Sequence, residues 1–342
     1  MDSVSQMALG AAVSVAVMGR HAGIGKAALA GALLGTLPDM DVVIDYGDPV
    51  SNMTKHRGAS HALFYLTLCA PLLGGMLGRR AHWQRWTLAI WLIFMTHVGI
   101  DFMTVYGTQL GQPFTDYPFG VGSIFIIDPL YTLPLLVGLW CALRRRNEGG
   151  LKANRLGLWL STLYLGWSLV AQWQVGIKAE SLLARQGIAA SQVLVTPSPL
   201  NTLLWRVLAM TPTGYAEGHI SLLDREPTPF TLHDGGRELY QAWQEQPHVA
   251  RMAWFTKGFF SMSTRGNELV ITDLRMGQEP GYVFNFVVAE RAEQGDWRAL
   301  PVPRQFSERP GGAAVAWLWR RVLGQPVMPP GAGNGSQAAR LH

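Results

Sequence analysis

The chain has 342 residues, of which 49% are hydrophobic and only 15% are charged. An ordinary soluble domain carries about 25% charged residues, so the composition argues against a wholly soluble protein. The net charge is +5, but basic patches with interleaved aromatic residues are not visible, and we expect no direct nucleic-acid binding.

The first 177 residues are apolar, with rare charges. They contain six candidate helices, at 6–19, 25–37, 61–78, 86–102, 124–143 and 156–177. A membrane-spanning helix needs roughly 20 mostly apolar residues. We therefore predict an all-α transmembrane helical bundle of about six helices, in which the short, Gly- and Ala-rich first two form a tight hairpin.

Basic residues fall in three alternate loops between these segments. They are Arg20, Lys26, Arg79, Arg80, Arg85, Arg144, Arg145, Arg146, Lys152 and Arg155. Loops rich in Lys and Arg stay cytoplasmic. The pattern predicts a multi-pass membrane protein, with the acidic and histidine-containing loops and the C-terminal domain on the outer side.

The C-terminal half reads like a soluble protein. Short strand-like runs at 192–196, 215–223, 255–263, 268–273 and 282–289 are separated by Gly, Pro and Asn. We predict four regions: a membrane-embedded domain at 1–145, a basic cytoplasmic loop with the sixth helix at 146–177, a mostly β (α+β) extramembrane accessory domain at 178–327, and a disordered tail at 328–342.

Acidic and histidine residues recur in short motifs on the predicted outer side. Asp39 and Asp41, one residue apart, can reach one cation, although an Asp near a helix end also serves as a cap. His56 and His61 flank Gly58, which permits a turn that points both rings at one centre. Neutral imidazole is a common ligand of zinc and iron.

A second His–Asp pair lies within an apolar helix. His97 and Asp101 are four residues apart, so they share one helix face. Burial of such residues is costly without partners, and the alternatives are a metal site or a His–Asp hydrogen bond between helices. Asp128 precedes Pro129 at the start of another apolar run, where it would either cap the helix or bind metal.

Together these motifs predict one divalent metal site. Asp and His with open coordination positions are typical of hydrolytic metal centres, sometimes with two ions. The predicted ligands are Asp39, Asp41, His56, His61, His97, Asp101 and Asp128, and the predicted catalytic acids or bases are Asp39, Asp41 and Asp101. We expect zinc, although manganese and iron suit the same ligands. HExxH, GxSxG, Walker and dinucleotide-binding motifs are missing from the sequence.

The segments MDSVSQ, LPDMD, HRGASH, THVGID and YGTQ resemble the membrane-bound, metal-dependent hydrolase family with the YdjM/YbcI-type domain. That family is also described as LexA-binding, inner-membrane-associated hydrolases, and the resemblance covers approximately residues 1–145. By the family pattern, the ligand-like positions are Asp39, Asp41, His56, His61, His97 and Asp101.

The chain departs from the pattern at Gln6, where many members carry His, at Ser60, which stands for Thr, and at Ala62, which stands for Ser. The family is similar to zinc phospholipase C and to a zinc-dependent nuclease. The resemblance therefore implies phosphoester substrates and a bacterial inner membrane, so that the predicted outer side, with the C-terminal domain, is the periplasmic side.

These observations lead to three hypotheses about function. The first is a hydrolase that uses metal-activated water on phosphoesters, with membrane lipids among its substrates. The second is an ion-binding transporter component, because intramembrane His and Asp also mark ion pathways. The third is a non-catalytic membrane regulator. The polar residues gather at one end rather than lining a path, which favours the hydrolase.

Overall fold

The structure is a computed structural model that describes residues 1–226, 228–291, 295–308 and 312–330. The side chains of Arg79 and Arg80, and residues 331–342 of the predicted tail, lie outside the described residues. The chain forms two compact units. The first unit comprises Met1–Val43, His56–Val170 and Pro199–Asn201, and the second comprises Ile44–Lys55, Ala171–Ser198 and Thr202–His342.

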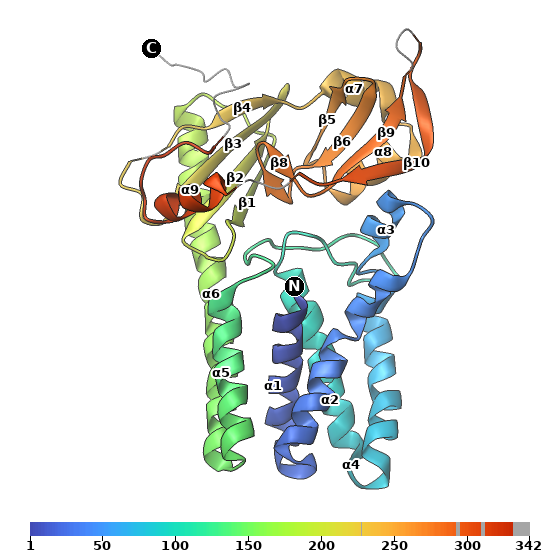
Figure 1. The fold of residues 1–342 in the computed structure, drawn as a ribbon, viewed down its shortest axis with the longest axis vertical. Helices are drawn as coiled ribbons and strands as arrows, with labels where there is room; N and C mark the ends of the chain where they lie inside the picture. Colours follow the sequence, from blue (N-terminus) through green and yellow to red (C-terminus); the bar gives the residue numbers. More distant parts are fainter. Residues whose placement is uncertain (227, 292–294, 309–311, 331–342) are drawn as a thin grey trace. The chain divides into compact units, whose positions relative to one another are not determined.

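The N-terminal part is helical. Its elements are α1 (Ser3–Ala22), α2 (Ile24–Thr36), the 3₁₀ helix η1 (Pro38–Val43), α3 (Pro49–Lys55), the 3₁₀ helix η2 (Ala59–His61), α4 (Leu63–Phe102), α5 (Pro129–Arg145) and α6 (Glu148–Arg185). Within the first unit, α1, α2, α4 and α5 run side by side (Figure 1). Their core includes the fully buried Met18, Ile90, Ile93 and Leu135.

Glycines allow α1 and α2 to pack closely. A Cβ atom added at Gly10 would lie 2.3 Å from Gly31 O, and one added at Gly35 would lie 2.6 Å from Gln6 O. Small residues let helix backbones approach in this way. This contact brings the end of α2, and η1 after it, close to the start of α1.

Helix α4 folds back on itself. Trp91 Nε1 donates to Thr67 Oγ1 at 3.2 Å. A Cβ atom added at Gly74 would lie 2.6 Å from Thr87 N. The halves of α4 before and after the turn are therefore antiparallel neighbours (Figure 1), and they correspond to the helices predicted at 61–78 and 86–102.

The predicted six-helix transmembrane bundle is wrong. Among the described residues, no single helix combines the length and the apolar composition needed to cross a membrane, whereas one bent pair, Pro49–His61 with Leu63–Gly78, meets both requirements together. Helices α2 and α5 have 13 and 17 residues, short of the roughly 20 required. Helix α6 has 38 residues, but Gly, Ser, Thr, Gln and Trp dilute its apolar residues.

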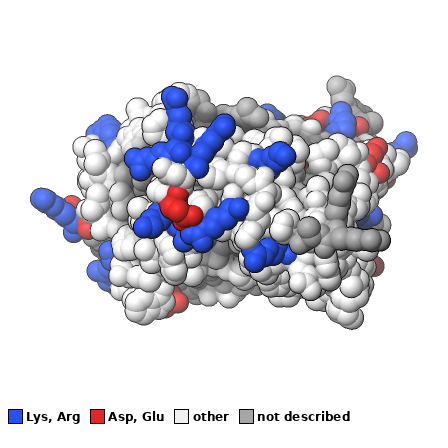
Figure 2. All heavy atoms as spheres, turned by 90° about the horizontal axis from the view of Figure 1, so that it is seen from below, with Lys and Arg blue, Asp and Glu red and all other residues white. Residues whose placement is uncertain are grey.

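The loops predicted to be positive meet at one end of the first unit. Arg20, near the end of α1, donates to Glu148 Oε1 at 2.9 Å at the start of α6. Arg85 of α4 contacts the ring of His21. Figure 2 shows Lys and Arg side chains gathered on this face. Because α1 is 20 residues long, its first residues lie about 30 Å from this basic end.

The second unit is built from two antiparallel four-stranded sheets, ordered β1-β2-β3-β4 and β10-β9-β6-β5. The strands are β1 (Gln192–Pro197), β2 (Leu204–Met210), β3 (Gly214–Ser221), β4 (Thr231–Asp234), β5 (Phe260–Arg265), β6 (Glu268–Asp273), β7 (Gly277–Gln278), β8 (Gly281–Tyr282), β9 (Asn285–Glu290) and β10 (Arg298–Phe306). Helices α7 (Arg237–Trp243), α8 (Pro247–Phe255) and α9 (Ala313–Val322) complete it.

The predicted order of a helical part followed by a β-sheet part is thus present. In the first sheet Val207 lies opposite Gly218, and in the second Ile271 lies opposite Phe286. Trp205 and Val207 share a core with Val175 and Ala179 of the last turns of α6.

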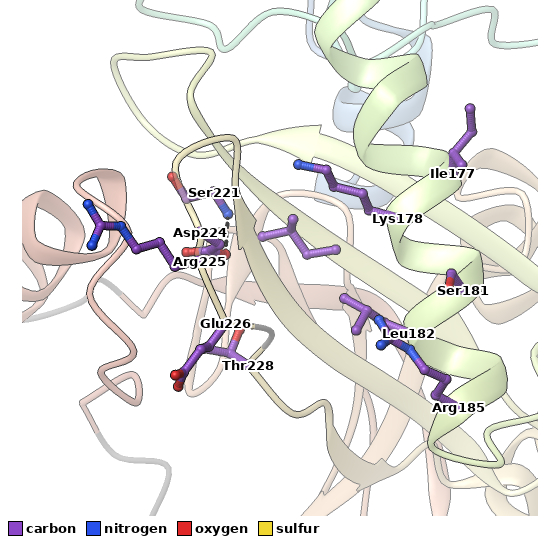
Figure 3. A pocket seen from close by; sticks show the side chains of 11 residues that line it. Ile177, Lys178, Ser181, Leu182, Arg185, Ser221, Asp224, Arg225, Glu226 and Thr228 are labelled. Atoms are coloured by element: carbon purple, nitrogen blue, oxygen red, sulfur yellow. Dashed lines mark hydrogen bonds between the residues drawn. The ribbon is translucent and has the colours of Figure 1, made fainter.

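A pocket of about 370 Å³ lies in the second unit. Figure 3 shows that its lining residues come from α6 on one side and from the end of β3 and the following loop on the other. Lys178, Arg185 and Glu226 line it, so its walls carry charges of both signs. Asp224 on its wall is bound by Arg321, at 2.7 Å and 2.8 Å.

Candidate metal centre

Four side chains with metal-binding atoms converge in the first unit: Asp39, His61, His97 and Asp101. Asp39 lies on η1 and His61 ends η2, whereas His97 and Asp101 lie on the second half of α4. Residues four apart on a helix share a face, so the last two meet the short 3₁₀ elements together. Three of the four are essentially fully buried, while the Asp39 side chain is 21% exposed.

Five distances between the four ligand atoms are 3.2–3.6 Å, and all four atoms lie within 4.8 Å of one another. His61 Nε2 lies 3.2 Å from Asp39 Oδ1, 3.3 Å from Asp101 Oδ2 and 3.2 Å from His97 Nε2. His97 Nε2 lies 3.4 Å from Asp101 Oδ2 and 3.6 Å from Asp39 Oδ1. A regular tetrahedron with such edges has its centre about 2.0–2.2 Å from each corner, which is the range of zinc–nitrogen and zinc–oxygen distances.

His97 is oriented by the backbone of α2. Its Nδ1 lies 2.7 Å from Gly35 O. A carbonyl only accepts, so Nδ1 carries the proton and Nε2 turns its lone pair toward the other three ligand atoms. Metal-binding histidines are usually held in this way through their second nitrogen. Gln6 Nε2 donates to His97 O at 3.3 Å, and thus Gln6 contacts the backbone of a ligand residue.

His61 is oriented by a relay of two side chains. Ser60 Oγ donates to Asp41 Oδ2 at 2.6 Å and lies 2.8 Å from His61 Nδ1. Because the single hydroxyl proton goes to Asp41, Ser60 accepts from His61 Nδ1. The Nε2 atom of His61 therefore also presents a lone pair to the centre.

Two basic groups contact the Oδ1 atom of Asp101. Arg57 Nη2 lies 3.2 Å from Asp101 Oδ1, and the Met1 amine donates to the same oxygen. The other oxygen, Oδ2, is buried and has no hydrogen-bond partner within the described part of the chain. A buried carboxylate oxygen that lacks a donor and faces two imidazole lone pairs fits a cation at that point.

The electrostatics keep both carboxylates ionised. Burial alone would raise the pKa of Asp39, but hydrogen bonds with His61 and His97 outweigh it and hold the pKa below the usual range. Burial would likewise raise the pKa of Asp101, yet the Arg57 charge and the Met1 amine hold it well below its usual value. Burial lowers the pKa of His61, but the carboxylates of Asp101 and Asp39 prevail and raise it, so that in the metal-free protein a proton on Nε2 takes the place of the cation.

The other three predicted ligands lie outside this group. Asp41 Oδ1 lies 2.7 Å from His56 Nδ1, and Arg57 N donates to Asp41 Oδ2 at 2.9 Å. Asp128 caps α5, accepting from Leu130 N at 3.0 Å. Of the two roles considered for Asp128, capping is the one seen.

Sequence reasoning missed Arg57 and the role of Ser60. The sequence motifs do not single out Arg57, and they mark Ser60 only as a departure from the family pattern. Their functions depend on contacts with Asp101 and Asp41, which are distant in the chain. The signal available in the sequence was their place within HRGASH, between the two histidines.

A divalent ion fits this site. Two imidazole nitrogens and two carboxylate oxygens suit zinc, manganese or iron. Each of the two histidines is held in the tautomer that a metal requires, and the buried Asp101 Oδ2 is otherwise unsatisfied.

Comparisons with known proteins identify the family of the chain. The family described as YdjM inner membrane protein matches residues 1–175, just over half of the 342-residue chain. The uncharacterized protein YfhP of Bacillus subtilis (strain 168) is 25% identical over 232 residues, which cover 63% of this chain and 68% of the relative. No solved structure is significantly similar to the chain. The match to the family confirms the resemblance found in the sequence motifs, and the chain belongs to the YdjM inner membrane protein family.

Proposed function

We propose that the protein is a metal-dependent hydrolase of phosphoesters. The observation that carries the proposal is the metal group, which consists of Asp39, His61, His97 and Asp101. Its ligand atoms lie within 4.8 Å of one another, and His61 Nε2 lies 3.2–3.3 Å from each of the other three. When bound, such an ion lowers the pKa of water and polarises a phosphoryl oxygen.

The ligand types favour catalysis over a purely structural role. Structural zinc sites are usually built from Cys with His, whereas this group contains two carboxylates and no Cys. Manganese and iron accept more than four ligands, which would leave positions open at the same four side chains. The partial exposure of Asp39 supplies an approach from solvent.

Two further residues are suited to move a proton. The His56 side chain is 25% exposed, and its Nδ1 lies 2.7 Å from Asp41 Oδ1. A carboxylate at that nitrogen fixes the orientation of the His56 ring. The ring centroids of His56 and His61 are 6.2 Å apart, so the outer nitrogen of His56 can exchange a proton with a substrate bound at the group.

The surroundings of Asp39 suit a substrate with an apolar part. Residues three apart on a 3₁₀ helix lie in one row. Leu37, Met40 and Val43 form such a row and are 45%, 55% and 73% exposed. This apolar row beside a ligand carboxylate supports phospholipids as a substrate class.

The family description supports a location at the inner membrane. We further propose that the metal group and the second unit are periplasmic, because the basic loops lie at the opposite end of the first unit. In a variant without Cys69 and Cys141, a membrane-impermeant thiol reagent applied to intact cells should label Asp116→Cys and Glu245→Cys but not Glu148→Cys. Labelling of only Glu148→Cys would reverse the proposed orientation.

The activity is tested on purified protein in detergent. A nitrophenyl phosphodiester and a short-chain phospholipid should both be hydrolysed, with loss of activity on chelation and recovery when zinc or manganese is added back. Asp39→Asn and Asp41→Asn should abolish turnover. Glu148→Gln, the same carboxylate-to-amide change at the basic end of the unit, is the matched control and should keep full activity.

The same assays separate the alternative functions. A transporter component or a regulator would bind metal without turnover in detergent. Metal bound at the group with no hydrolysis of phosphodiesters, phospholipids or acyl esters would reject the hydrolase.

A further inference from the structure

Arg57 is a buried basic residue in direct contact with the metal group. Its side chain is only 6% exposed, and its Nη2 atom lies 3.2 Å from Asp101 Oδ1. Asp101 faces the other ligands through Oδ2, at 3.3 Å from His61 Nε2 and 3.4 Å from His97 Nε2. Arg57 thus engages the carboxylate oxygen that points away from the metal position.

The guanidinium is itself held from two further sides. Arg57 Nη1 donates to Thr104 Oγ1 at 3.2 Å, and Thr104 Oγ1 donates to Asp101 O at 2.7 Å. The guanidinium also lies over the Tyr106 ring, 5.0 Å from its centroid, a favourable contact for Arg. Arg57, Thr104 and Asp101 therefore form a closed ring of contacts that fixes the Asp101 carboxylate relative to its own helix.

The backbone of Arg57 is built for this position. Its φ angle is +60°, which costs free energy for a residue with a side chain. Arg57 N donates to Asp41 Oδ2 at 2.9 Å, and Arg57 O accepts from Gln109 N at 3.0 Å. Hydrogen bonds to its N–H and its C=O thus stabilise the left-handed backbone of Arg57. In this conformation the side chain reaches Asp101 while the backbone N–H donates to Asp41.

We propose that Arg57 is a positioning residue that holds Asp101 as a one-oxygen metal ligand. The inference rests on the proposed metal site. Two effects of Arg57 on metal affinity have opposite signs. The guanidinium repels a divalent cation, whereas the fixed orientation of Asp101 favours binding, and loss of such an orienting contact typically weakens binding about 10–100-fold. The ring of contacts with Thr104 indicates that orientation dominates.

The test is zinc affinity of the full chain, measured by competition with a chromophoric chelator. Arg57→Ala should bind zinc about 10–100-fold more weakly than the wild type. Arg57→Lys keeps the charge but loses the planar fork that reaches Asp101 and Thr104 together, so it should restore only part of the affinity. Thr104→Val, which leaves the guanidinium charge in place, should also weaken binding. Arg20→Ala removes another carboxylate-bound Arg, at the basic end of the unit, and should leave the affinity unchanged.

Each result decides between the two effects. Unchanged or tighter zinc binding by Arg57→Ala would overturn the proposal, because repulsion would then outweigh orientation. Full recovery in Arg57→Lys would also overturn it, since charge alone would suffice. If Arg57→Ala does not fold, Arg57→Lys and Thr104→Val decide the question. A wild type that binds no zinc, manganese or iron would instead reject the metal site and this inference with it.

Discussion

His61→Ala is the most direct test of the metal group. His61 is fully buried, and its Nε2 atom lies within 3.3 Å of each of the other three ligand atoms. The substitution removes a ligand and leaves three. Loss of an orienting contact alone typically costs 10–100-fold in affinity, so loss of a ligand should cost at least that, or about 1.4–2.7 kcal/mol.

The effect can be measured as metal-dependent stability. At a free metal concentration 100 times the dissociation constant, binding stabilises the folded state by about 2.7 kcal/mol. If the affinity falls 100-fold, the same metal concentration equals the new dissociation constant, and the stabilisation drops to about 0.4 kcal/mol. The assay is the shift in Tm on adding zinc, together with metal content after gel filtration.

The comparison with and without metal separates ligation from packing. The cavity left by His61→Ala lowers Tm in both conditions, whereas the lost ligand lowers only the increment that zinc adds. His21→Ala, at the basic end of α1, is the matched control and should keep the increment. If His61→Ala bound as much metal as the wild type with an unchanged Tm increment, the group would not be a metal site.

Two further predictions concern residues outside the metal group. Asp128→Ala should lower the free energy of unfolding by about 0.5–2 kcal/mol, because it removes the α5 cap and the acceptor of the Tyr164 hydroxyl. The metal content should not change. A loss of metal would show that Asp128 is a ligand after all. Burial lowers the pKa of His219 from 6.5 to about 4, so the folded state favours the neutral imidazole. The free energy of unfolding keeps its full value above pH 6.5. It decreases as the pH falls from 6.5 toward 4, because there the unfolded chain takes up a proton that the folded chain does not. The loss amounts to about 3 kcal/mol, and it should be absent from unfolding curves of His219→Gln; an equally steep pH dependence in that variant would refute the assignment.

The secondary structure could be predicted where the sequence pattern had one meaning. The apolar run at 6–19 lies within α1, and the run at 25–37 lies within α2 except for its last residue, Leu37. The runs at 192–196 and 268–273 lie within β1 and β6. Strand β2 was missed because Leu204–Met210 is apolar at every position except Arg206, so its sequence lacks the alternation that marks a half-exposed strand. The prediction of a membrane bundle was wrong because an apolar run does not show where its helix ends. Helices α2 and α5 end after 13 and 17 residues.

The site was predictable in composition but not in arrangement. The sequence motifs named all four members of the metal group, since Asp and His are rare in apolar segments and expensive to bury. Spacing alone did not separate Asp39 from Asp41, because both lie on η1. Only the fold shows that Asp39 joins His61 and His97, while Asp41 turns to Ser60 and Arg57.

The four side chains of the metal group differ in how firmly they are held, and under the proposed function this difference predicts which one takes part in turnover. His97 is fixed by Gly35, His61 by Ser60, and Asp101 by Arg57. Within the described part of the chain, the Asp39 carboxylate is bonded only to the two histidines of the group, and it is the partly exposed member.

Asp39 is therefore the ligand that can move when a substrate arrives, since no second contact opposes its displacement. We expect Asp39→Asn to abolish turnover while it weakens zinc binding less than His97→Ala does, because the three ligands that remain are the preorganised ones. The measurement is zinc affinity beside the rate of phosphodiester hydrolysis for both variants. If Asp39→Asn lost as much affinity as His97→Ala, all four ligands would be equivalent, and a role for Asp39 in the reaction would need a different basis.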